Sequence, residues 1–203
     1  MRIEQALAFA LFAVVAAGTP GPSNTLLVAT GARVGVVRGL RALLGQGIGM
    51  GVMIVVVALG FGALVVAQPE LVGFIRWSGI AFMLWLAWKI ASSPGRLVAE
   101  GDARPIGFLG LATFQWVNPK AWLITTSAAA SFADAGADQA LHAIVLGALF
   151  TAVALVICFP WLALGAGIQR VLRTHRSMRV FNIAMGMLLA LSVLPLVFES
   201  LAN

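Results

Sequence analysis

Six long apolar runs constrain the fold of this chain more than any other feature of its sequence. A helix needs about 20 predominantly apolar residues to cross the hydrocarbon core of a bilayer. Runs of that length recur along the whole chain, at approximately residues 6–30, 43–67, 71–90, 106–131, 140–168 and 180–201. The sequence therefore predicts an all-α integral membrane protein with six transmembrane helices.

The composition excludes a soluble globular protein. Hydrophobic residues make up 61% of the chain and charged residues only 10%, whereas a soluble domain carries about 25% charged residues. Six spans leave no room for a soluble domain, so we predict a single domain over residues 1–203. Hydrophobicity continues past Pro22 to Thr30, so the first run is expected to remain as a transmembrane helix rather than to be cleaved as a signal peptide.

The basic residues predict how the chain is oriented in the membrane. The net charge is +6, which in a soluble protein would suggest nucleic acid, but here these residues lie between apolar runs and no nucleic-acid partner is expected. Most of them fall in the first, third and fifth connections: Arg33, Arg38, Arg41, Lys89, Arg96, Arg104, Arg170, Arg173, Arg176 and Arg179. The positive-inside rule places these connections in the cytoplasm. Both termini are then predicted on the outer side of a multi-pass protein in contact with membrane lipids.

The six runs divide into two inverted three-helix repeats, of about residues 1–91 and 105–203. The first helix of each repeat is broken by proline, at Pro20-Gly21-Pro22 and at Asn118-Pro119-Lys120. Proline removes a backbone donor and kinks or breaks a helix, and glycine permits unusual backbone angles. Many secondary transporters bind substrate at interrupted helices in matching positions of two repeats.

Lys120 is the only formal charge near the centre of an apolar run. A charge at that depth costs at least about 2.5–3.5 kcal/mol on insertion scales. At helical rise it lies on the order of 15 Å from either end of its run. The alternative interpretation is a lysine whose side chain extends along the helix to the headgroups. That distance is long for a side chain with four methylene groups. We therefore interpret Lys120 as part of a site.

The two breaks together predict a binding site for an anionic group. The half-helix that opens at Ser23, Asn24 and Thr25 presents bare N–H groups and a positive dipole end, which suit a carboxylate. A packing kink that binds no ligand remains the alternative for Pro-Gly-Pro. The Gly45–Gly51 segment is interpreted mainly as a close-packing face, with Gln46 as a pathway candidate. The predicted translocation site comprises Pro20, Gly21, Pro22, Ser23, Asn24, Thr25, Gln46, Gln115, Asn118, Pro119 and Lys120.

The sequence carries no signature of an enzyme. It has no His-Glu-x-x-His motif, no Cys/His cluster and no Gly-x-Ser-x-Gly motif. The single cysteine, Cys158, permits no intramolecular disulfide and no cysteine-based metal site, and we interpret it as a small buried apolar residue. We expect no cofactor, no metal site and no catalytic residue.

At these motifs the chain resembles the LysE/RhtB family of bacterial amino-acid exporters. The resemblance spans roughly residues 15–125, with matching hydropathy to the end. Its motifs are Pro20-Gly21-Pro22 with Asn24, the stretch Gly31 to Leu40 leading to Gly45, Arg76-Trp77-Ser78-Gly79 through Trp88-Lys89, and Phe108-Leu109 leading to Asn118-Pro119-Lys120-Ala121.

The resemblance implies a six-helix exporter in the bacterial cytoplasmic membrane that moves amino acids or similar small metabolites outward in exchange for protons. The chain departs from the family after Asn-Pro-Lys, where Trp122, Thr125-Thr126-Ser127 and Ala130-Ser131-Phe132 replace the usual aromatic residues and Pro-Gln-Phe end. Its substrate therefore need not match that of a well-studied member. A permease of the same fold for a metal ion or another small ion is the alternative function, and whether the protein forms homo-oligomers stays open.

Overall fold

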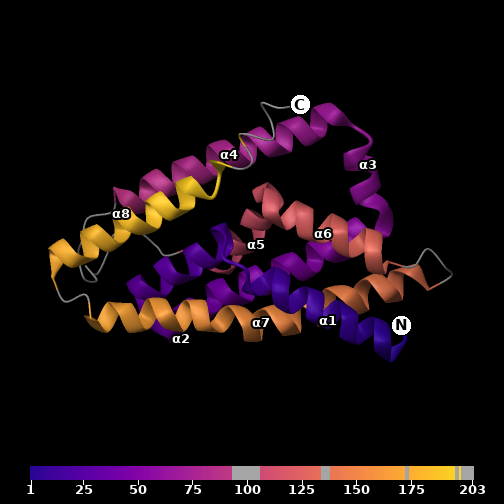
Figure 1. The fold of residues 1–203 in the computed structure, drawn as a ribbon, viewed down its shortest axis with the longest axis horizontal. Coiled ribbons are helices and arrows are strands. Elements are labelled where there is room, and N and C mark those ends of the chain that lie inside the picture. The colour runs from indigo at the N-terminus through magenta and orange to yellow at the C-terminus, as the bar shows by residue number, and fades with distance from the viewer. Residues whose placement is uncertain (93–105, 134–137, 172–173, 195–196, 198–203) are drawn as a thin grey trace.

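A computed structural model describes residues 1–92, 106–133, 138–171, 174–194 and 197 (Figure 1). These residues form helices joined by short turns, with no strand among them. Most of the third predicted connection, residues 93–105, lies outside the described part. The helices are α1 (Ile3–Gly18), α2 (Pro22–Val56), the π-helical segment η1 (Val57–Phe61), α3 (Gly62–Val66), α4 (Pro69–Ala91), α5 (Phe108–Val117), α6 (Pro119–Phe132), α7 (Gln139–Val171) and α8 (His175–Leu191).

Helix α2 folds back on itself at Gly35. This glycine has φ 74° and ψ −178°, a region that only glycine enters at low cost. Asn24 and Gln46 lie on opposite sides of it and are joined by a 3.0 Å hydrogen bond, whereas a straight helix would hold them about 33 Å apart. The connection expected between residues 30 and 43 is therefore a turn at one glycine, and Arg33 and Arg38 lie in helical backbone.

Glycines allow the two arms of α2 to pack closely on α7. A Cβ on Gly31 would collide with the backbone of Leu162, and one on Gly51 would collide with Thr151 and Gly147. Gly45, in the same arm of α2 as Gly51, faces the backbone of Phe108 at the start of α5. The close-packing interpretation of the Gly45–Gly51 segment is confirmed, since these helices approach to backbone contact.

Both predicted helix interruptions are present. Helix α1 ends at Gly18 and α2 begins at Pro22, and α5 and α6 are separated at Asn118. Asn118 has extended backbone, with φ −89° and ψ 109°. Each break has a proline as the first residue of the following helix, where a missing N–H costs no helical hydrogen bond.

The helices form two groups with the second break between them (Figure 1). Helices α1, α2 and α7 lie together, α4 packs against α8, and α5 and α6 lie between the two groups. Helix α8 begins five residues before the predicted run at 180, because the Thr174 side chain caps its first turn by accepting from the N–H of Ser177 at 3.1 Å.

Among the residues that the structure describes, three helical stretches are long and apolar enough to cross a membrane, by length and composition: Pro22–Val65, Pro69–Ala91 and Gln139–Ile168. The first of these includes the reversal at Gly35. The surface carries many exposed large apolar side chains, such as Ile3, Leu109 and Val156. Such a surface is unfavourable in water and favourable against lipid.

Candidate functional site

The two helix breaks meet at Lys120. The ammonium nitrogen Nζ of Lys120 donates a hydrogen bond of 2.7 Å to the carbonyl oxygen of Thr19 and one of 3.4 Å to that of Pro20. Both carbonyls belong to the first break, and Lys120 belongs to the second. A cation from one break thus pairs with carbonyl groups that the other break leaves without helical partners.

Side-chain hydrogen bonds connect the same two breaks a second time. Asn118 donates from Nδ2 to the hydroxyl oxygen of Ser23 at 3.1 Å, and that hydroxyl donates to Oε1 of Gln115 at 3.2 Å. Oδ1 of Asn118 accepts from the backbone N–H of Lys120 at 3.1 Å, which caps α6. Asn118 and Gln115 are buried, so their polar atoms need these partners.

Asn24 stabilises the end of α1. Its Nδ2 donates to the carbonyl oxygens of Ala17 and Thr19 at 2.8 and 3.1 Å. Its Oδ1 accepts from Nε2 of Gln46, which also lies 3.3 Å from the sulfur of Cys158. Oε1 of Gln46 is buried and has no hydrogen-bond partner, so the cluster holds one acceptor that remains available.

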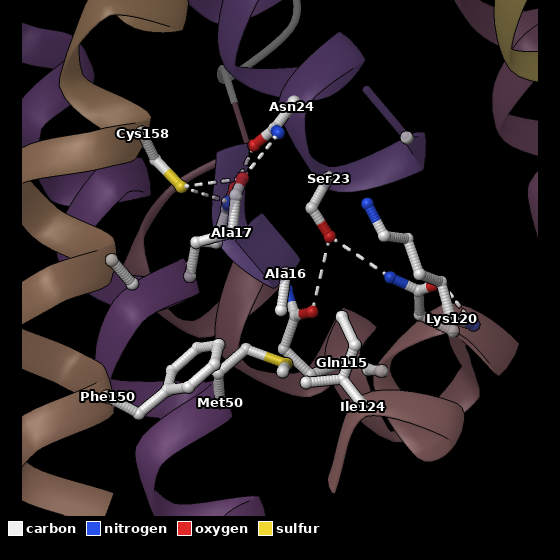
Figure 2. A pocket seen from close by; sticks show the side chains of 15 residues that line it. Ala16, Ala17, Ser23, Asn24, Met50, Gln115, Lys120, Ile124, Phe150 and Cys158 are labelled. Carbon is white, nitrogen blue, oxygen red and sulfur yellow. Dashed lines mark hydrogen bonds between the residues drawn. The ribbon is translucent and has the colours of Figure 1, made fainter. Parts of the chain in front are cut away.

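These side chains surround a small cavity (Figure 2). Asn24 and Cys158 lie on one side, Lys120 on the other, and Met50 and Phe150 below. Its volume is about 30 Å³, which holds about two water molecules, and no amino acid fits in it without movement. Seven of the predicted site residues line it, namely Gly21, Ser23, Asn24, Gln46, Gln115, Asn118 and Lys120.

Gly21 is needed for space and not for an unusual backbone angle, which corrects the expectation from Pro-Gly-Pro. Its φ and ψ are both −178°, an extended conformation that any residue adopts. A Cβ on Gly21 would lie 3.0 Å from Cδ and 3.1 Å from Nζ of Lys120. The absence of a side chain therefore lets the lysine cross directly over the first break.

A second, larger cavity of about 630 Å³ adjoins the small one, and Gly21, Asn118 and Lys120 line both. Three further predicted residues, Pro20, Pro22 and Pro119, line only the larger cavity. Thr25, the last predicted residue, lines neither cavity and donates its hydroxyl to the carbonyl oxygen of Gly21 at 3.1 Å.

Cys158 and Arg76 line the cavities but were not predicted to do so. Cys158 is buried as expected, yet it lies among polar side chains at the small cavity. Apart from being the single cysteine, it is marked in the sequence only by its position two residues before Pro160, which lies within α7. Arg76 lies on α4 and belongs to a motif of the family resemblance, but nothing in the sequence places it at a cavity.

Comparison with known proteins places these motifs in a family. The model of the LysE type translocator family matches residues 14–200. The cysteine/O-acetylserine efflux protein of Escherichia coli O139:H28 (strain E24377A / ETEC) is 32% identical over 184 residues, covering 90% of this chain and 92% of the relative.

Two further relatives carry the same name. The protein of Escherichia coli strain K12 is 31% identical over the same coverage, and that of Salmonella choleraesuis (strain SC-B67) is 36% identical over 62% of this chain and 64% of its own length. No solved structure matches the chain. The family match covers both breaks and nearly all of the sequence, so this chain belongs to the LysE type translocators and is a membrane transport protein rather than an enzyme.

Proposed function

We propose that this protein exports small neutral amino acids or closely related metabolites across the bacterial cytoplasmic membrane. The observation that carries the proposal is the meeting of two helix breaks at Lys120, beside a small cavity that several polar side chains line, in a chain of the LysE type translocator family. The name that its relatives carry, cysteine/O-acetylserine efflux protein, supports a substrate of this size and charge.

The substrate carboxylate would bind between Lys120 and the first turn of α2. An ammonium group has three donors, and Lys120 directs two of them at the carbonyls of Thr19 and Pro20. No side chain caps the first turn of α2, so its N–H groups can receive an anion. The first turn of α6 differs, because Asn118 already caps it.

The substrate ammonium would bind on the opposite side of the small cavity. Oε1 of Gln46 is a buried acceptor without a partner, and the carbonyl oxygen of Ala17 marks the negative end of the α1 dipole. Positive groups on one side and acceptors on the other give the cavity the polarity of an amino-acid zwitterion. Because about 30 Å³ is too small for that solute, the cavity must open for binding.

The proposed mechanism is alternating access about the paired breaks, with six spans arranged as two inverted three-helix repeats in a single domain. Each repeat supplies one break, and rocking of one repeat against the other would open the site to either side in turn. The basic connections support a topology with both termini outside. Exchange for protons rests on the family resemblance, since no Asp, Glu or His of the described residues lines either cavity.

A metal ion as substrate is less well supported. Metal transport favours Asp, Glu, His or Cys ligands within the membrane, and the described residues contain no group of three such side chains that could hold an ion. Within the described parts of the chain, Cys158 is the only residue of these four types that lines either cavity.

An export assay tests the proposed function. Cells of a strain without its own exporters of these solutes would express the protein and be loaded with alanyl dipeptides of cysteine, serine, alanine or lysine. Faster efflux of a small neutral amino acid than from cells with empty vector is the expected result. Efflux unchanged for every amino acid, with the protein present in the membrane, would reject the proposal.

A further inference from the structure

Two cations among the described residues line the larger cavity, Lys120 and the half-buried Arg76. Its volume of about 630 Å³ falls within the range of about 300–1,000 Å³ that is usual for small-molecule sites. Residues of both helix breaks line it, namely Pro20, Gly21 and Pro119. The larger cavity therefore shares residues with the proposed binding site, because Gly21, Asn118 and Lys120 also line the small cavity.

Arg76 has no partner in the described part of the chain that would explain its position. It is half-buried, it lines the cavity, and it makes no hydrogen bond or ion pair with a described residue. A guanidinium has five donors arranged to bind a carboxylate with two parallel hydrogen bonds. Partial burial of a guanidinium without a counter-ion costs solvation free energy, and a bound anion would offset that cost.

The remaining lining residues indicate where the cavity leads. Val65 and Val72 flank the turn at Gln68 between α3 and α4, and Ser192 follows the end of α8. The predicted topology places these chain segments toward the outer side of the membrane. The cavity therefore extends from the two breaks toward the side on which an exporter releases its substrate.

We propose that this cavity is the release vestibule of the transporter, and that Arg76 is a second binding station that receives the substrate carboxylate from Lys120. This inference rests on the proposed function. With one cation after the other along the path, the carboxylate could leave Lys120 for Arg76 and would not cross an apolar passage without a positively charged partner. The alternative anion for Arg76 is a lipid phosphate, which would reach it if lipid filled the cavity from the side.

Thiol labelling distinguishes a water-filled vestibule from a lipid-filled one. Thr126→Cys on α6 and Ser192→Cys each introduce a thiol into the lining, and Val156→Cys, exposed on α7, is the control. Wild-type protein gives the background from buried Cys158, the only native cysteine. A charged, water-soluble methanethiosulfonate should modify both cavity thiols and leave Val156→Cys unmodified. Cavity thiols that react only with a lipid-soluble maleimide would overturn the proposal.

Substrate protection tests the role of Arg76. O-acetyl-L-serine should slow modification of Thr126→Cys, and its decarboxylated analogue, 2-aminoethyl acetate, should not. Arg76→Gln should raise the half-protecting concentration by about tenfold or more, as expected for loss of a charge-assisted hydrogen bond. Arg38→Gln removes the same charge from an exposed position on α2 and should leave protection unchanged.

The outcomes separate this inference from the function on which it rests. Export of amino acids with no protection of either cavity thiol, or with equal protection in the Arg76→Gln variant, would overturn the release vestibule alone. Absence of export of every amino acid would overturn the proposed function and the vestibule with it. A purely structural Arg76 would lower the amount of folded protein and leave the half-protecting concentration of the remainder unchanged.

Discussion

Nζ of Lys120 lies 2.7 Å from the carbonyl oxygen of Thr19, although 101 positions separate the two residues in the chain. The contact joins the second helix break to the first. A cation in the interior of a membrane protein is costly, and here carbonyl dipoles at the end of α1 offset part of that cost. The lysine therefore has a structural partner in the described state and one remaining donor for a substrate.

Replacement of Lys120 should abolish most of the export activity. Lys120→Gln removes the charge that we propose binds the substrate carboxylate, and a hydrogen bond to a charged group is worth about 1.5–3 kcal/mol. Export from dipeptide-loaded cells should therefore fall by at least about tenfold at equal protein level. Lys89, the other lysine of the chain, stacks over the ring of Trp85 at 4.7 Å on α4. Lys89→Gln should retain activity, and equal activity of both variants would remove Lys120 from the mechanism.

Gly21 should be required for transport more than for folding. In Gly21→Ala the new methyl group would lie 3.0 Å from Cδ of Lys120, and the flexible lysine would move away with little strain. Displacement of a positioned group by on the order of 1 Å can cost as much as about a hundredfold in rate, so export should fall by about tenfold. The thermal stability of the purified protein should hardly change. Gly73→Ala, whose Cβ meets no atom within 4 Å, should be silent in both measurements.

The sequence allowed the helix breaks and their joint site to be predicted, because a proline and a charge inside an apolar run each carry a local cost. Pro22 and Pro119 begin helices, and Lys120 lies at the junction. The match in position between the two predicted repeats then suggested that both breaks contribute to one site. The positions of Cys158 and Arg76 in the walls of the two cavities could not be predicted in the same way. Helices that are apolar on all sides have no polar stripe that shows which face lines a cavity.

The reversal within α2 shows a second limit of sequence reasoning. A connection was expected between residues 30 and 43, but one glycine turns the chain. Gly35 has the required positive φ, while its neighbours continue both helices without proline, asparagine or serine to mark a loop. Nothing local distinguishes Gly35 from Gly31 or Gly39, which serve helix packing instead. The distinction arises from contacts with α7 that only the folded chain makes.

Asn24 should be essential because its amide holds the end of α1. Asn24→Asp keeps the size of the side chain and replaces the Nδ2 donor by an acceptor that faces the carbonyl oxygens of Ala17 and Thr19. Loss of partners for buried polar groups costs about 1–3 kcal/mol, so the apparent melting temperature in detergent should fall. Export should fall with it, because the same carbonyls shape the site.

Thr113→Ala is the control for Asn24, because Thr113 is exposed and its hydroxyl bonds only to carbonyls of its own helix. A surface change of this kind usually alters stability by no more than about 0.5 kcal/mol. If the Asn24→Asp protein had the same apparent melting temperature as Thr113→Ala and the wild type, the hydrogen bonds of Asn24 would not stabilise the break.

Gly35 should be the glycine of α2 that tolerates alanine least on backbone grounds alone. With φ 74° and ψ −178°, a non-glycine residue there costs about 1–3 kcal/mol, and the two arms of α2 would separate or twist. Gly35→Ala should lower the apparent melting temperature and reduce export in proportion to the folded fraction.

Gly167→Ala is the matched control, since that glycine lies within α7 with no atom within 4 Å of its added Cβ. Alanine in a helix interior is favoured over glycine by about 0.5–1 kcal/mol, so the control should be neutral or slightly stabilised. If Gly35→Ala matched it, the reversal between Asn24 and Gln46 would not depend on the positive φ of residue 35.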